Sequence, residues 1–235
     1  VQNLEASAIP ITRTTIPTMS VVGGIHVRLH PSRHDHLLIE FVDEQGINIT
    51  KAKEKKIEGA YFKEDLRRAA IPEIGEVFYP TQVLDVYSHS FEKHLNVQAV
   101  NNSRAKVVID YAYAVSGAVL PLLLGKFGCD AVVLNASLSQ TALSNEERET
   151  LLNELGQVVE ALKANMGVQV AANGEQLILV DEAGLPIRGE ILTALMVNMM
   201  MTAHPRSTIV VPVHASSAVE QIVRRHDGKV IRTKA

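Results

Sequence analysis

Basic and hydroxyl side chains gather in one short stretch, residues 26–36, with the sequence HVRLHPSRHDH. The histidines suggest a metal, but protein metal sites usually add Cys or paired carboxylates, and here Asp35 stands alone, so we expect no metal. Guanidinium forks suit phosphate, so Arg28, His30 and Arg33 indicate a modest anion site. A solvated polar loop without a ligand is the commonest form of such a stretch, and this alternative stays open.

A second stretch, residues 164–182, has the sequence ANMGVQVAANGEQLILVDE. Val168 and Val170 alternate toward one face, and residues 177–180 form a short apolar run. Residues 172–175 between them have the composition of a turn. The pattern predicts a hairpin of two buried strands whose loop carries Asn173 and Glu175.

The elements around the first stretch are predicted from its periodicity. Ile25, Val27 and Leu29 alternate with polar residues, which predicts a half-buried strand with its apolar side in the core, followed by a second strand at 37–42. A charged helix is expected over 51–69, packed through an apolar stripe of Ile57, Tyr61, Phe62 and Leu66. A further helix is expected over 81–95.

The second half of the chain predicts a βαβ series. A strand at 106–111 ends near Asp110, a place where α/β folds often put function, and a helix at 118–127 closes at Gly128. A strand at 131–134 follows. Capping boxes at Ser144 and Ser217 begin two more helices. The remaining predicted elements are a helix over 186–203, with its methionines in the core, and strands at 208–213 and 229–232.

Composition excludes several classes of protein. The 235 residues carry a formal charge of −3, so nucleic-acid binding through bulk charge is not expected. Cys129 is the single cysteine, which excludes an internal disulfide and fits a reducing compartment. No apolar run reaches the roughly 18–20 residues that span a bilayer. We therefore expect a cytoplasmic protein without nucleic-acid or membrane partners.

Ordered landmarks give the chain a resemblance to the α-D-phosphohexomutase superfamily, the phosphomannomutases and phosphoglucomutases. The frame of the family's metal loop is present as Ala164, Gly167, Val180, Asp181 and Gly184. The strand that opens with Gly23-Gly24-Ile25 is similar to the strand before the family's phosphoserine loop. Asp110, Gly117 and Gly128 fall in places that match its second domain.

The resemblance implies a site whose chemistry is degenerate. The family's three metal-binding aspartates fall on Ala171, Asn173 and Glu175, and its arginine falls on Gln176. The catalytic serine position holds His30, and Ser32, the nearby hydroxyl, lies two residues further on. The vestigial phosphoserine loop is thus assigned to Ser32 and His30, substrate phosphate to Arg28 and Arg33, and a degenerate metal site to Asn173 and Glu175. The family uses Mg²⁺, and we expect none bound here.

The expected fold is α/β, with three-layer α/β/α domains and mixed, largely parallel sheets. Residues 1–104 are assigned to part of domain I, 105–183 to domain II and 184–235 to the start of domain III. The expected function is a hexose-phosphate-related module with lost or weak mutase activity. We expect it to be covalently linked to further domains, such as a sugar-1-phosphate nucleotidyltransferase. The alternative is an active mutase that uses Ser32.

Overall fold

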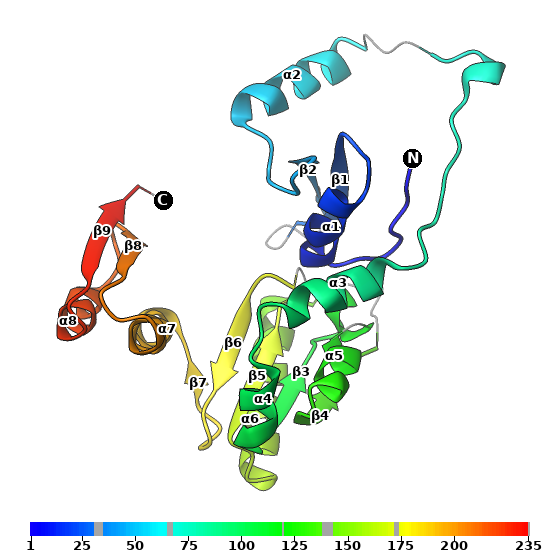
Figure 1. Cartoon of the computed structure of the whole chain (residues 1–235). Coiled ribbons are helices and arrows are strands. Elements are labelled where there is room, and N and C mark those ends of the chain that lie inside the picture. The colour runs from blue at the N-terminus through cyan, green and yellow to red at the C-terminus, as the bar shows by residue number, and fades with distance from the viewer. Residues whose placement is uncertain (31–34, 65–67, 119, 138–142, 172–173, 235) are drawn as a thin grey trace.

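A computed structural model describes the chain except for residues 31–34, 65–67, 119, 138–142, 172–173 and 235. The chain forms three parts in sequence order, which Figure 1 shows one after another in blue, green to yellow, and orange to red. The middle part holds the largest sheet and the most extensive core.

The central sheet contains five strands in the order β4-β3-β5-β6-β7. β3 pairs in parallel with β4 and β5, whereas β6 and β7 add antiparallel strands at one edge. The strands are β3 (Lys106–Asp110), β4 (Asp130–Leu134), β5 (Met166–Val170), β6 (Leu177–Val180) and β7 (Pro186–Ile187). The predicted mixed, largely parallel α/β fold is confirmed, and so is the hairpin of β5 and β6.

Successive residues of a strand point to opposite faces of the sheet. Both faces of this sheet carry apolar side chains, and helices cover both. Val108 packs with Leu155 and Val159 of α6, whereas Ile109 and Tyr111 pack on the other side near Leu124 of α5. The helices of this part are α3 (Val83–Glu92), α4 (Val97–Ser103), α5 (Leu120–Lys126) and α6 (Asn145–Ala161). The capping box predicted at Ser144 is present at the start of α6.

The N-terminal part combines α1 (Ile9–Thr15) with an antiparallel ribbon of β1 (Gly23–Leu29) and β2 (Leu37–Asp43). Both strands were predicted, but the predicted burial is wrong. Ile25 is 63% exposed, whereas His26 and Arg28 face inward. The reason is that α1 and the short turn after it pack on the polar face of β1, where Ile16 lies against Gly24.

The helix predicted over 51–69 is shorter and does not pack as expected. It runs over α2 (Lys51–Phe62) and has no buried residue. Tyr61 and Phe62 of the predicted stripe are mainly exposed, while Leu66 lies outside the described residues. Figure 1 shows α2 standing apart from the sheets, in agreement with the absence of buried residues in this helix.

The C-terminal part is a parallel pair, β8 (Thr208–Pro212) and β9 (Lys229–Thr233), with α7 (Gly189–Ala203) and α8 (Ala218–Arg225). Val197 and Met201 of α7 enter its core, but Met196, Met199 and Met200 are exposed, so the predicted core role holds only for Met201. The capping box predicted at Ser217 is wrong: its side chain makes no cap hydrogen bond, and Glu220 instead pairs with Arg232 at 2.8 Å.

Candidate functional site

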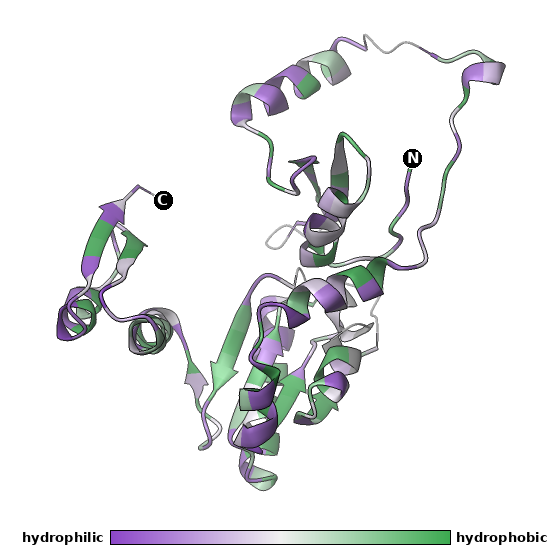
Figure 2. Ribbon diagram, viewed as in Figure 1, coloured by the Kyte–Doolittle hydropathy of each residue, from purple (hydrophilic) through white to green (hydrophobic). Residues whose placement is uncertain are grey.

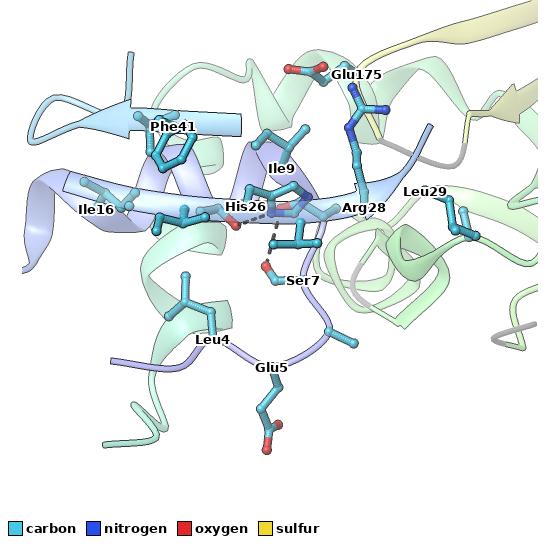
Figure 3. Close-up of a pocket in the computed structure, with 18 of the residues that line it drawn as sticks. Leu4, Glu5, Ser7, Ile9, Ile16, His26, Arg28, Leu29, Phe41 and Glu175 are labelled. Atoms are coloured by element: carbon cyan, nitrogen blue, oxygen red, sulfur yellow. Dashed lines mark hydrogen bonds between the residues drawn. The ribbon is translucent and has the colours of Figure 1, made fainter. Parts of the chain in front are cut away.

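A cavity of about 2210 Å³ lies between the N-terminal part and the hairpin of β5 and β6. Figure 3 shows His26 and Arg28 rising side by side from β1, with Glu175 from the β5–β6 loop nearby. The chain segment around Leu4 and Ser7 forms the opposite wall. The cavity therefore brings together the two stretches that the sequence singled out.

Arg28 is held by a short ion pair inside this cavity wall. Its Nε donates a hydrogen bond to Glu40 Oε2 at 2.7 Å, across the β1–β2 ribbon. Both side chains are largely buried. The pair fixes the direction of the guanidinium, because a buried charge needs a partner. The anion-binding role of Arg28 stays a prediction.

His26 lies close to charged side chains of both signs. Its Nδ1 is 3.3 Å from Thr12 Oγ1 of α1. Burial lowers the pKa of His26, and the cations Arg28 and Arg13 act in the same direction against Glu40 and Glu175. The imidazole therefore remains neutral to lower pH than an exposed histidine would.

The vestigial phosphoserine loop is described only at its edges. The His30 backbone N–H donates to the His36 carbonyl at 2.9 Å, and His30 lines the cavity. Ser32 and Arg33 lie outside the described residues. Their assigned roles, and that of His30, remain predictions.

The loop between β5 and β6 carries the positions that the resemblance assigns to metal ligands. Ala171 has no ligand atom in its side chain, Asn173 lies outside the described residues, and Glu175 is 3.5 Å from Arg13 Nη2. Mg²⁺ prefers several oxygen ligands in a tight octahedron. A single carboxylate that already faces a guanidinium does not fit this ion. Elsewhere in the described chain, no three His, Cys, Asp or Glu side chains gather at metal-binding range.

The family frame around this loop is occupied by residues that pack. Val180 is fully buried, and a side chain at Gly167 would collide with Val159 of α6. Asp181 Oδ1 accepts hydrogen bonds from the backbone of Ala183 and Leu185, which closes the turn. These landmarks therefore shape the hairpin by packing against α6 and by closing the turn after β6.

A buried polar cluster at the carboxyl ends of three strands was only partly foreseen. Asp110 of β3 is fully buried and accepts hydrogen bonds from Asn135 Nδ2 and Gln169 Nε2, each at 3.0 Å. The Ala112 N–H also donates to it at 2.8 Å. The sequence indicated Asp110 but not its amide partners, because Asn135 and Gln169 are distant in the chain and no local pattern joins them to Asp110.

Comparisons with known families agree with this geometry. Residues 1–68 match the model of phosphoglucomutase/phosphomannomutase alpha/beta/alpha domain I, and residues 85–184 match alpha/beta/alpha domain II. The two matched segments together cover more than half of the chain. The assigned domain boundaries themselves remain a prediction.

Similar proteins carry mutase names. A phosphoglucomutase/phosphomannomutase of Thermococcus kodakarensis is 28% identical over 90% of this chain and 47% of its own length. A phosphoglucosamine/phosphogalactosamine mutase of Sulfurisphaera tokodaii is 25% identical over 96% of this chain and 50% of its own length. The chain thus spans about half the length of the curated relatives it matches.

Solved structures show the same fold. A phosphoglucomutase/phosphomannomutase family protein of Burkholderia thailandensis superposes with a TM-score of 0.78 at 18% identity, over 100% of this chain and 52% of that one. A structure titled putative phosphomannomutase, from Thermus thermophilus, gives 0.77 at 14% identity, over 97% and 52%. None of the described helices is long and apolar enough to cross a membrane. From the matched domains, the relatives and the fold together, the chain belongs to the phosphohexomutase superfamily.

Proposed function

We propose that this chain is a hexose-phosphate-binding module with lost or weak mutase activity. The observation that carries the proposal is the chemistry of residues 171–176. Phosphoryl transfer depends on positioning and on cations that neutralise the developing charge. Here Ala171 provides no ligand and Glu175 faces Arg13, so the loop lacks the oxygen cage that Mg²⁺ needs.

The cavity supports the binding half of the proposal. It is large enough for a hexose phosphate, since small-molecule pockets usually measure about 300–1,000 Å³. Polar groups of Arg28, Arg148 and Gln169 line it among apolar side chains. Such a wall holds a sugar by hydrogen bonds and its phosphate by a guanidinium.

Isothermal titration calorimetry tests this binding. Glucose 1-phosphate or mannose 1-phosphate is titrated into the protein in the presence of EDTA, with inorganic phosphate as a reference ligand. We expect saturable binding of a hexose phosphate that is roughly tenfold weaker in Arg28→Met, because one phosphate contact is lost. Arg68→Met, at an exposed position, is the matched control. Absence of saturation with either sugar phosphate contradicts the proposal.

A second candidate function is an active phosphomannomutase or phosphoglucomutase that uses Ser32. The mutase names of the relatives favour it. It requires Ser32 to act from a position two residues beyond the family's serine and Asn173 and Glu175 to serve as weakened ligands. Turnover that depends on Ser32 distinguishes it from the first proposal.

We further propose that the module serves a larger enzyme, such as a sugar-1-phosphate nucleotidyltransferase, as a binding or structural part. The support is chemical: such an enzyme and a phosphohexomutase share hexose 1-phosphates as ligands. The complete reading frame provides the test. A glycine-rich nucleotidyltransferase motif in the same polypeptide is expected, and a complete frame without one contradicts this proposal.

A further inference from the structure

We infer that Arg13 is a positioning residue that takes the place of a metal cation at the β5–β6 loop. Its guanidinium on α1 faces the carboxylate of Glu175 across the boundary between the N-terminal part and the central sheet. This pairing, together with the approach of Gly174, holds Gly174 and Glu175 against α1 without Mg²⁺. The inference does not depend on which ligand enters the cavity.

Contacts on both sides of the ion pair support this arrangement. Arg13 Nη2 and Glu175 Oε1 are 3.5 Å apart, and about two thirds of each side chain is buried (30% and 33% exposed). Next to Glu175, Gly174 approaches α1 so closely that a Cβ there would lie 3.3 Å from Ala8 Cβ and 3.6 Å from Pro10 Cδ. Gly174 therefore packs against the start of α1, and Glu175 adds an ion pair with Arg13.

Arg13 itself is held in place by its neighbours. Its backbone carbonyl lies against Gly46, at a place where a side chain on residue 46 would collide with it. Gly46 has a φ of +74°, which favours glycine at this turn. The Nε atom of Arg13 is buried and has no hydrogen-bond partner among the described residues. The guanidinium thus enters the boundary between the two parts instead of extending into solvent.

Charge balance explains why a guanidinium suits this loop. A cage of three carboxylates needs a divalent cation to offset its charge, whereas residues 171–176 carry one carboxylate. One guanidinium neutralises one carboxylate and offers several N–H donors in a fixed plane. Mg²⁺ would have to displace Arg13 and then bind a single charged oxygen ligand. We therefore expect the contact between Arg13 and Glu175 to be independent of Mg²⁺.

Amide hydrogen exchange tests the inference directly on the intact chain. The probes are the N–H groups of Ala171, which donates to Gln176, and Gly174, which donates to Ala171, both at 2.9 Å. We expect both to exchange about two- to fivefold faster in Arg13→Met and in Glu175→Gln, as for a partly exposed ion pair. The matched controls are Arg68→Met and Glu182→Gln, at exposed positions. Amides of β3 report whether each variant remains folded.

Two further arms separate a charge effect from a packing effect. The charge-swapped double variant Arg13→Glu/Glu175→Arg and the conservative variant Arg13→Lys should each recover part of the protection. Millimolar MgCl₂ should leave the exchange of the unmodified protein unchanged. Exchange rates that are unaffected by both single substitutions, or no recovery in the swapped variant, would overturn the ion pair. Saturable protection by MgCl₂ would overturn the replacement of the metal.

Discussion

Among single residues, Asp110 shows how a buried carboxyl group is held by neutral hydrogen-bond donors. Asn135 after β4 and Gln169 of β5 each donate from a side-chain amide, and Ala112 donates from its backbone N–H. Three non-glycine residues with positive φ, Ala112, Tyr113 and Asn135, occur beside it. Strained backbone at the carboxyl edge of a parallel sheet is typical of positions that the surrounding contacts determine.

Replacing Asp110 with Ala should strongly destabilise the fold. The change leaves the donors of Asn135, Gln169 and Ala112 without their acceptor, and we expect a loss of roughly 2–3 kcal/mol in the free energy of unfolding. Urea denaturation measures it. Asp130→Ala, an exposed carboxylate on the neighbouring strand, should change it by less than about 0.5 kcal/mol. Equal effects of the two substitutions would contradict the role of the cluster.

His26 should make stability depend on pH. Burial lowers its pKa below the ordinary value of 6.5. Between the two pKa values the unfolded chain is therefore protonated at His26 to a greater extent than the folded chain. The contribution of the neutral His26 side chain to the free energy of unfolding is complete above about pH 6.5. It is lost as the pH falls through the lowered pKa of the folded state. We expect His26→Gln to lose less stability than the unmodified protein between about pH 7.5 and pH 5.5. Urea denaturation at both pH values checks this, and identical losses would contradict it.

Among elements, α6 and the β5–β6–β7 hairpin series depend on close backbone approach. Gly156 of α6 lies so near Gly184 that a side chain at either position would strike the carbonyl oxygen of the other. Gly184 also has a φ of +76°, as its tight turn requires. Two glycines thus set the distance between α6 and the turn that joins β6 to β7, at the opposite end of β6 from Glu175.

Gly156→Ala and Gly125→Ala form a matched pair that tests this contact. Both positions are helical, but a Cβ at Gly125 meets nothing within 4 Å. We expect Gly156→Ala to lower the free energy of unfolding by about 1–3 kcal/mol through overpacking. Gly125→Ala should raise it by up to about 1 kcal/mol, because alanine favours helix. Thermal and urea denaturation of both variants check the opposite signs, and a stabilised Gly156→Ala variant would refute the contact.

The elements also show what sequence patterns predict and what they miss. Alternation and turn chemistry predicted β1, β2 and the β5–β6 hairpin, since these signals are local. Alternation predicted the wrong side of β1 to be buried, because the buried side depends on where α1 packs. The pairing of Arg13 with Glu175 was also missed, since no local pattern joins residues so distant in the chain.

The whole molecule exposes far more surface than a compact protein of its size. Its accessible area is 16110 Å², whereas a compact monomer of this mass has about 10,000 Å². Figure 2 shows apolar residues on the β1–β2 ribbon and on α2. The exposed apolar face of the ribbon consists of Ile25, Val27, Leu29, Leu37 and Ile39. Large exposed apolar patches usually bind other surfaces.

The chain should therefore bind the dye ANS and self-associate with rising concentration. Fluorescence and sedimentation measure the two properties. Replacing Ile25, Val27 and Ile39 together with Thr keeps strand propensity and removes apolar area, so both signals should fall. A monomer that binds no dye would contradict an open apolar face.

The most direct test of the central proposal is a phosphorus-31 NMR assay of turnover. The protein is incubated with Mg²⁺, a hexose 1,6-bisphosphate primer and glucose 1-phosphate or mannose 1-phosphate, with Ser32→Ala as the control. A binding module with a degenerate loop predicts no measurable conversion to the 6-phosphate by the folded protein. Conversion that disappears in Ser32→Ala would contradict the account and identify Ser32 as the nucleophile.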